Sequence, residues 1–187
     1  MRIHLGTNFR GYKVARDLES RLIAAGVDVH WMGSPTYDAN DDYSGIAIRV
    51  AQAVVADEDH AVYSRGIQIG GEGVGEVIAA NKVNGARVVA ALSTEYVAAA
   101  RKHADANVLV IPSYWLDDQA IDELITVFTT TEFGNSIDDA RRIINTAEFE
   151  TSGTIEGWAI EEGKVTSIPA DPTSTGKFAA GAGITHD

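Results

Sequence analysis

Two glutamates stand inside a run of glycines in the stretch IGGEGVGEVIAANKVNGAR, which covers residues 69–87. They are Glu72 and Glu76, and the glycines around them are Gly70, Gly71, Gly73 and Gly75. Because glycine has no side chain, such a loop lets the backbone close around a small polar ligand. A carboxylate beside that ligand can accept a proton from it. The stretch is therefore a candidate site for acid–base chemistry.

Two other interpretations of the loop stay open. A dinucleotide-binding turn is one, but the spacing here is G-x-G-x-G instead of G-x-G-x-x-G, and the loop does not follow the first strand of the chain. Two glutamates would also repel a pyrophosphate. The other interpretation is a tight turn with glutamates on the surface and no ligand at all.

The elements that must position this loop are predicted from alternating apolar runs and helical patterns. Strands are expected at residues 2–6, 27–32, 66–69, 86–92 and 107–111, and helices at 11–25, 46–55, through 78–80, 94–103, 117–130 and 136–149. This alternation predicts an α/β fold, a Rossmann-like three-layer α/β/α sandwich around a mainly five-stranded parallel sheet. Ligands bind at the carboxyl ends of such strands, and the glycine loop follows the third one.

Composition sets the domain organisation and excludes several partners. The 187 residues, 45% of them hydrophobic, predict one domain over residues 1–150 and an extension over 151–187, with a possible hairpin and a flexible tail. The 27 acidic and 15 basic side chains give a net charge of −12, which disfavours nucleic acid as a partner. The chain has no cysteine for thiolate chemistry. No apolar run is long enough for a signal or a membrane span, so we expect no membrane partner and a cytoplasmic location.

Several motifs, taken in order, are typical of one family. GTNFRG, YDANDDY, GGEGVGEVIAANKVNGAR, KHADANVL and ARRI follow one another between residues 2 and 149. In these motifs the chain resembles the ribose-5-phosphate isomerase B and galactose-6-phosphate isomerase family. The resemblance implies a sugar isomerase domain over residues 1–150 that interconverts aldose and ketose sugars or sugar phosphates through an enediolate, without metal or cofactor. It also implies a homodimer or a dimer of dimers with active sites at the subunit interface.

The resemblance assigns catalytic roles to three residues. Glu76 matches the catalytic glutamate of one branch of the family and is our candidate for the base. Glu72 stands where other members have Cys, Ser or Thr, so it is the base itself, shares a proton with Glu76, or hydrogen-bonds sugar hydroxyls. His103 matches a histidine that assists the reaction or contacts the substrate. Each residue also has a purely structural interpretation. Glu76 would be a glutamate favoured in the first turn of a helix by the helix dipole, Glu72 a solvated loop residue, and His103 a surface residue.

Residues expected to bind the substrate come from several motifs. They are Asn8, Phe9, Arg10, Tyr43, Gly71, Gly73, Gly75, Asn81 and Arg142. Tyr43 is the stronger candidate for a substrate contact, whereas Asn81 equally fits a role in fixing the loop to the sheet. Arg142 is expected to act from a partner subunit, together with Arg10.

Departures from the family pattern predict a substrate other than ribose 5-phosphate. The first turn normally reads G-x-D-H-A-G, but Asn8 and Phe9 replace the Asp and the His that bind and open the sugar ring. Tyr114 stands where an arginine is common, and Asp138 and Asp139 replace a basic pair. We expect a short sugar phosphate such as a tetrose phosphate, a non-phosphorylated sugar, or a uronate. The alternatives are a non-catalytic sugar-binding or partner subunit, and a divalent metal held by Glu72, Glu76 and His103.

Overall fold

The elements follow one another in strict βα alternation over most of the chain. The computed structural model describes residues 1–153, 157–161 and 164–168. The strands are β1 (Arg2–Thr7), β2 (Asp28–Trp31), β3 (Ser64–Gly70), β4 (Val88–Ala90), β5 (Val108–Pro112), β6 (Gly157–Glu161) and β7 (Lys164–Ile168). The helices are α1 (Tyr12–Ala24), α2 (Tyr43–Asp59), α3 (Val74–Ala80), α4 (Thr94–Ala104), α5 (Asp118–Thr130) and α6 (Ile137–Ser152). The chain divides into two units, Met1–Asp139 and Ala140–Asp187.

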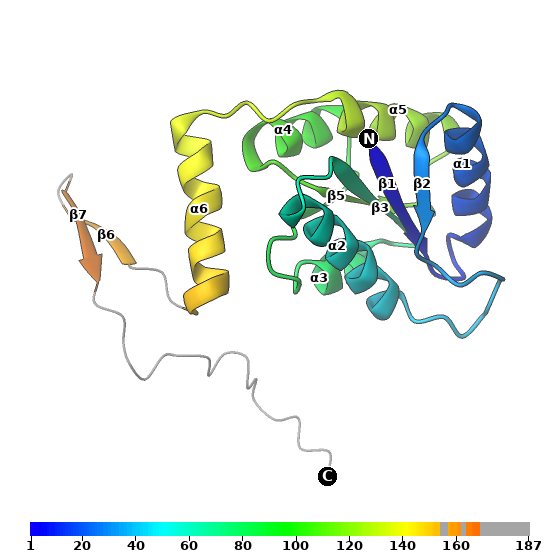
Figure 1. The fold of residues 1–187 in the computed structure, drawn as a ribbon, viewed down its shortest axis with the longest axis horizontal. Coiled ribbons are helices and arrows are strands. Elements are labelled where there is room, and N and C mark those ends of the chain that lie inside the picture. The colour runs from blue at the N-terminus through cyan, green and yellow to red at the C-terminus, as the bar shows by residue number, and fades with distance from the viewer. Residues whose placement is uncertain (154–156, 162–163, 169–187) are drawn as a thin grey trace, which may run out of the picture. The chain divides into compact units, whose positions relative to one another are not determined.

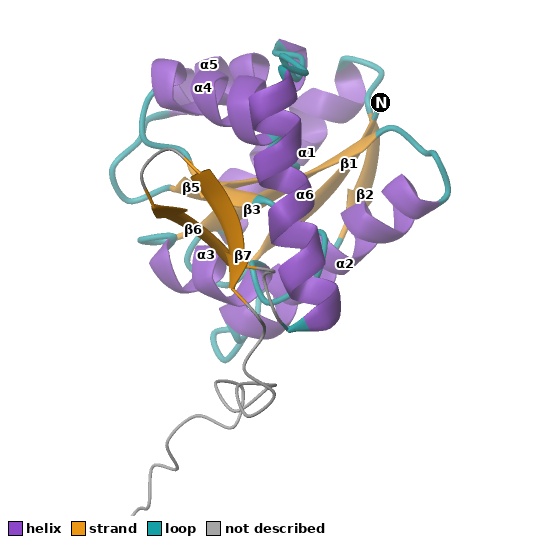
Figure 2. Cartoon of the chain, turned by 90° about the vertical axis from the view of Figure 1, so that its left-hand side faces the viewer, coloured by secondary structure: helices purple, strands orange, loops and turns teal. Residues whose placement is uncertain are grey.

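The first unit is built on a parallel sheet with the strand order β2-β1-β3-β5-β4. Every neighbouring pair in this sheet is parallel, and β3, at its centre, pairs with β1 from Ser64 to Ile69 and with β5 from Gly66 to Gly70. Helices cover both of its faces (Figures 1 and 2). The predicted three-layer α/β fold with a five-stranded parallel sheet is confirmed.

The two faces of the sheet carry cores of different composition. Helices α1, α4 and α5 pack on one face through large side chains such as Leu18, Ile121 and Phe128. Helices α2 and α3 pack on the other face, largely through alanines and valines. Successive residues of β5 alternate between the two cores, as a strand buried on both faces must.

Side-chain caps start three of these helices beside the sheet. Asp42 accepts a hydrogen bond from the backbone N–H of Ser44 at the start of α2. Ser93 begins α4 and Asp117 begins α5 in the same way. Helix α2 is longer than the predicted helix over residues 46–55, because its cap lies in a stretch whose composition is typical of turns. These caps fix the helix starts near the carboxyl ends of the strands.

The second unit contains the rest of α6 and an antiparallel pair of strands. β6 pairs with β7 from Gly157, opposite Ile168, to Glu161, opposite Lys164. The expected hairpin in the extension corresponds to this pair. The expected flexible end falls on residues 169–187, outside the described residues, and the domain boundary at residue 150 stays a prediction. Within the described ranges, no helix has the length and apolar character required to cross a bilayer.

Candidate active site

The glycine loop lies at the carboxyl end of β3, the central strand. It connects Gly70 to α3, which begins at Val74. Gly73 precedes that helix in the left-handed region, with φ of 79°, a conformation that a residue with a Cβ rarely adopts. The loops that follow β1 and β5 begin at the same end of the sheet, because these strands are parallel to β3. The sequence therefore predicted the position of the loop correctly.

Glu76 lies in the first turn of α3 and its side chain is turned inward. The residue is only 4% exposed. Its carboxyl group occupies the space beside Gly70, where an added Cβ would lie 2.6 Å from Glu76 Cδ. Burial raises the pKa of Glu76, its own backbone N–H lowers it, the charge of Glu72 raises it further and Arg10 opposes that rise. The result is a carboxyl group that is buried, close to the loop and more basic than an ordinary glutamate.

Glu72 forms an ion pair with Arg10, from the loop after β1. Arg10 Nη1 donates a hydrogen bond to Glu72 Oε2 over 2.8 Å, and the two side chains are 41% and 47% exposed. The Arg10 guanidinium also lies 5.5 Å from the ring centre of Phe9. Asn8 is buried and its Oδ1 accepts the backbone N–H of Arg10 over 3.1 Å. The first βα turn and the glycine loop are thus joined by a charged pair that partly neutralises both members.

Two tyrosines lie against the loop on either side. The ring of Tyr43, the first residue of α2, lies against Gly75, with its hydroxyl 2.6 Å from the position of an added Cβ. The ring of Tyr114, from the loop after β5, lies 2.8 Å from the corresponding position at Gly71. Larger residues at these two glycines would displace the rings. The structure therefore places Tyr43 against Gly75 of the loop that leads to Glu76, and the roles of Tyr43, Gly71, Gly73 and Gly75 in binding a substrate stay predictions.

The side chain of Asn81 hydrogen-bonds to backbone groups at the C-terminal end of α3. Its Nδ2 donates to the carbonyl oxygens of Val77 and Val88, both over 2.9 Å, and its Oδ1 accepts from Val88 N–H over 3.0 Å. The side chain joins the end of the helix to β4. This geometry favours the interpretation of Asn81 as a residue that fixes the loop to the sheet.

His103 lies near the amino ends of the strands, whereas Glu76 lies near their carboxyl ends. Helix α4 starts after β4 at the carboxyl edge, and its 11 residues span about 16 Å before His103 is reached in its last turn. His103 Nδ1 is 3.0 Å from Asp139 Oδ2, and its side chain is 56% exposed. Within one chain, Glu72, Glu76 and His103 do not come together. Arg142 lies on α6 in the second unit, and its role stays a prediction.

Two polar residues near the loop were not predicted as site residues from the sequence. Ser113, after β5, donates from its hydroxyl to Gly70 O over 2.7 Å. Gln68 is fully buried in β3, its Oε1 lies against Gly6, and its amide has no hydrogen-bond partner among the described residues. An amide in the otherwise apolar strand GIQIG was the available signal for Gln68. For Ser113, the only signal in the sequence was its position directly after an apolar strand.

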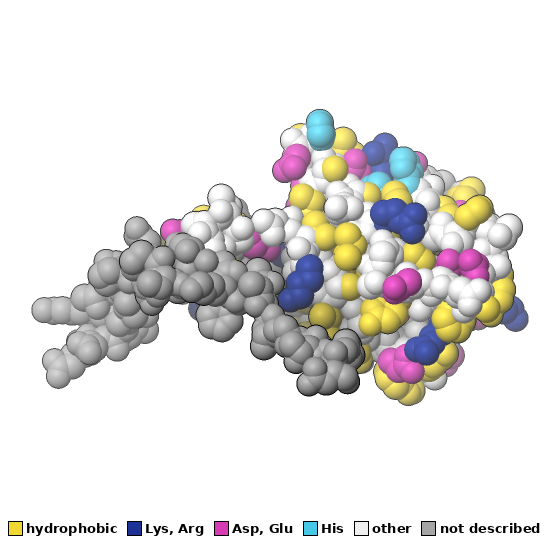
Figure 3. Space-filling view, turned by 90° about the horizontal axis from the view of Figure 1, so that it is seen from below, with side chains coloured by type: hydrophobic (Ala, Val, Ile, Leu, Met, Phe, Trp, Pro, Cys, Tyr) yellow, Lys and Arg dark blue, Asp and Glu magenta, His cyan; other side chains and the backbone are white. Residues whose placement is uncertain are grey.

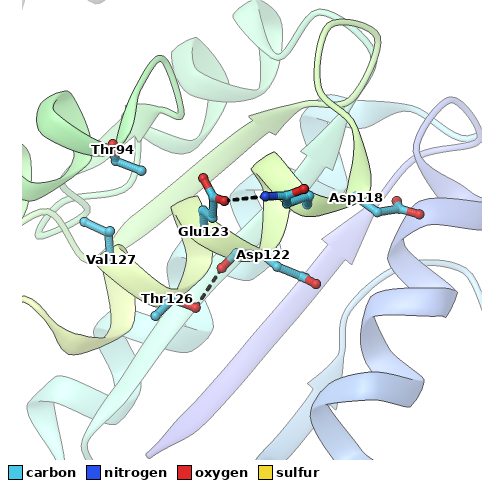
Figure 4. Close-up of a pocket in the computed structure, with 7 residues that line it drawn as sticks. Thr94, Asp118, Asp122, Glu123, Thr126 and Val127 are labelled. Atoms are coloured by element: carbon cyan, nitrogen blue, oxygen red, sulfur yellow. Dashed lines mark hydrogen bonds between the residues drawn. The ribbon is translucent and has the colours of Figure 1, made fainter.

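A separate cavity of about 750 Å³ lies beside α5 and the start of α4, and no residue of the glycine loop lines it. Its lining includes Thr94, Asp118, Asp122, Glu123 and Val127 (Figure 4). The side chains of Gln119 and Glu123 hydrogen-bond to each other there, as do Thr126 Oγ1 and the carbonyl of Asp122. None of the residues predicted to act on a substrate lines this cavity.

Apolar side chains remain exposed on the elements around the loop. Val74 and Ile78 of α3 are exposed, as are Leu92 after β4 and Tyr96 of α4. On the described part of the face seen from below, hydrophobic side chains form several groups between charged ones (Figure 3). Exposed apolar groups of this kind are typical of surfaces that contact another protein.

Comparison with known proteins connects this site to one family. A family model described as Ribose/Galactose Isomerase matches residues 3–145. Ribose-5-phosphate isomerase B of Mycolicibacterium paratuberculosis is 36% identical over 150 residues, which cover 80% of this chain and 92% of that protein. The protein of that name from Mycobacterium tuberculosis is also 36% identical, with coverage of 80% and 90%.

Solved structures give the same result. Ribose-5-phosphate isomerase B from Mycoplasma genitalium with bound ribulose-5-phosphate matches with a TM-score of 0.74 and 31% identity, over 80% of this chain and 96% of that chain. Type B ribose 5-phosphate isomerase from Trypanosoma cruzi matches with a TM-score of 0.74 and 30% identity, over 82% and 98%. The chain therefore belongs to the ribose/galactose isomerase family and is an aldose–ketose isomerase.

Proposed function

We propose that this isomerase uses Glu76 as its base and acts on a sugar or sugar phosphate other than ribose 5-phosphate. The observation that carries the proposal is that Glu76 is only 4% exposed, with its carboxyl group beside Gly70 and its pKa raised by burial. A base works best when its pKa is near the operating pH, and burial moves a carboxyl group in that direction.

The reaction begins with an open-chain sugar whose carbon next to the carbonyl faces Glu76. The carboxylate removes the proton from that carbon and an enediolate forms. The same group, now protonated, returns the proton to the neighbouring carbon, while a hydroxyl proton moves between the two oxygens. Negative charge develops on an enediolate oxygen, and hydrogen-bond donors must face it. The backbone N–H groups of the loop and the hydroxyl of Tyr43 are the candidate donors.

The charges around the loop support a shifted substrate. Phosphate sites usually present arginines whose donors are available to the ligand. Here the Arg10 guanidinium is already paired with Glu72 over 2.8 Å, and Tyr114, not an arginine, lies against Gly71. Asn8 and Phe9 offer no acid or imidazole for ring opening. These features favour a substrate that stays open-chain, such as a tetrose phosphate, or a sugar of low charge or a uronate.

A second copy of the chain is part of the proposal. His103 lies at the other edge of the sheet from Glu76 in its own chain, so a contribution to the site requires a partner. The exposed apolar side chains of α3 and α4 supply surface for such a contact. We therefore propose a homodimer, or a dimer of dimers, with the active site between subunits.

The experiment that tests the function measures exchange of the substrate α-proton with solvent. Phosphorylated and free aldoses, ketoses and uronates are incubated with the protein in deuterated water, and NMR follows loss of the proton signal. We expect exchange with at least one candidate and a loss of about 10²–10⁴-fold in the Glu76→Gln variant. Exchange at an unchanged rate in that variant would reject Glu76 as the base.

The second candidate is a partner subunit that takes part in isomerase activity only together with an unlike member of the family. The Arg10–Glu72 pair favours it, because a neutralised arginine binds an anionic sugar poorly. In that case the purified protein would exchange no proton with any sugar, and activity would arise only on mixing with another member of the family.

A further inference from the structure

Arg65 occupies a buried position at the start of β3, the end of the strand away from the glycine loop. It is 7% exposed and follows Ser64, the first residue of the strand. By the alternation of strand residues it shares a face with Ile67 and Ile69, which lie in the apolar core. Arginine is almost never fully buried unless it is paired.

The guanidinium of Arg65 has few partners. Its Nη1 donates to the carbonyl oxygen of Ser64 over 2.8 Å, and its central carbon lies 4.7 Å from the ring centre of Tyr63. Nε is buried and has no hydrogen-bond partner in the part of the chain that the structure describes. No carboxylate oxygen of a described residue lies within 4.0 Å of the Arg65 guanidinium nitrogens, the distance limit for an ion pair. Among the described residues, the hydrogen bonding of this guanidinium is therefore limited to the carbonyl oxygen of Ser64.

The carboxylates around Arg65 already bind other side chains. Glu58 accepts from Arg87 over 3.3 Å and from Asn107 over 3.2 Å. Asp105 accepts from Arg87 over 2.9 Å and from Arg101 over 2.7 Å. Burial, and next the charge of Arg101, lowers the pKa of Arg65, while Asp105 and Glu58 act in the opposite direction. A buried charge without a partner costs free energy, so an incoming anion would be favoured here.

A cavity opens beside this side chain. It measures about 270 Å³ and is lined by Glu58, Ala61, Val62, Tyr63, Ser64 and Arg65. Pockets for drug-sized ligands start at about 300 Å³, so this one suits a small ion or group. Glu58 is the one carboxylate among these lining residues, and it is held by Arg87 and Asn107.

We propose that this cavity binds a phosphate group through the guanidinium of Arg65, whose residue lines it. A guanidinium donates charge-assisted hydrogen bonds to phosphate oxygens, and its positive charge attracts the anion. The site is separate from the active site, because Arg65 and Gly70 are five residues apart on one strand, about 17 Å at the usual rise. Phosphate bound here stabilises the fold by removing an uncompensated charge from its interior.

Thermal unfolding in the presence of inorganic phosphate tests the proposal. The ionic strength is kept constant with sodium chloride, and wild type, Arg65→Met and Arg10→Gln are titrated in parallel. Arg10→Gln is the control for phosphate that binds at the glycine loop. We expect a saturable rise of the midpoint by several degrees in wild type and Arg10→Gln, and no rise in Arg65→Met. Proton exchange by Arg65→Met should equal that of wild type.

Further variants and ligands distinguish a phosphate site at Arg65 from other effects on stability. Without phosphate, Arg65→Met should unfold at the same temperature as wild type or higher, because a buried unpaired charge is gone. If Arg65→Met does not fold, Arg65→Lys replaces it: it keeps the charge but lacks the paired donors, and should show a reduced phosphate effect. A rise with glycerol phosphate as well as phosphate identifies the group as a monoester site. No rise in wild type, equal rises in wild type and Arg65→Met, or an equal rise with acetate would each overturn the proposal.

Discussion

Burial is the largest cause of the raised pKa of Glu76, the proposed base, and the charges of two neighbouring side chains adjust that pKa. Glu76 is buried next to Gly70, and Glu72 and Arg10 form an ion pair beside it. Among these neighbours, the negative charge of Glu72 raises the pKa of Glu76 and the positive charge of Arg10 lowers it. Each neighbour can be neutralised separately by a substitution to glutamine.

Substitutions of the two neighbours should move the pH profile in opposite directions. The acid limb of kcat/KM reports the pKa of the free base. Glu72→Gln removes the charge that raises the pKa of Glu76, so the limb should move to lower pH. Arg10→Gln removes the charge that lowers it, so the limb should move to higher pH. The measurement is kcat/KM against pH for wild type and both variants. A loss of all turnover in Glu72→Gln would instead point to Glu72 as the base.

Glu76 should also destabilise the folded protein at neutral pH. Its folded-state pKa is raised above its ordinary value of 4.5, so the folded protein binds more protons than the unfolded chain between these two pKa values. The free energy of unfolding contributed by this group therefore falls as the pH rises through that window. Glu76→Gln should unfold at a higher temperature than wild type at pH 7.

The difference should disappear in acid. Below pH 4.5 the carboxyl group is protonated in both states, and the glutamine variant has no further advantage. Thermal unfolding of both proteins at a series of pH values measures this. An advantage of the variant that is independent of pH would contradict an electrostatic origin.

At the scale of the elements, the turn from β3 into α3 leaves room for Glu76 only because residue 70 has no side chain. An alanine Cβ there would meet the carboxyl group of Glu76. Gly70→Ala should therefore displace Glu76 and reduce proton exchange by about 10²-fold or more, while circular dichroism stays that of the wild type. The matched control is Gly45→Ala in α2, where nothing lies within 4 Å of an added Cβ. That variant should keep its activity and gain about 0.4–1 kcal/mol of stability.

Local patterns were sufficient to predict most elements but not their ends. The strand expected over residues 86–92 is shorter in the structure, Val88–Ala90, partly because the side chain of Asn107 accepts the backbone N–H of Arg87 over 2.8 Å. The glycine loop could be placed at the carboxyl edge from strand–helix alternation alone. The pairing of Arg10 with Glu72 joins residues 62 positions apart, and no local pattern carries that information. The burial of Arg65 depends in the same way on tertiary packing.

At the scale of the whole molecule, a shared active site can be tested by mixing inactive chains. In a dimer of one Glu76→Gln chain and one His103→Ala chain, one site carries both substitutions and the other carries neither. Random reassortment of equal amounts should restore about a quarter of the wild-type exchange rate. The measurement is α-proton exchange before and after the two variants are unfolded and refolded together.

The control mixes each variant with itself by the same procedure. If the mixture stays as inactive as its components although size-exclusion chromatography finds dimers, then His103 does not act on the partner's site. The short edge strands, β2 with four residues and β4 with three, offer little backbone for one sheet to extend into another. We therefore expect the proposed dimer to form through helices and loops.

The complete burial of β3 has a consequence for experiments on backbone amides. All seven residues of this central strand are buried, from Ser64 to Gly70. Amides of such a strand exchange hydrogen with solvent only when the surrounding unit opens as a whole. Their exchange rates therefore report the total stability of the first unit. A ligand held at either end of the strand should slow all of these amides together.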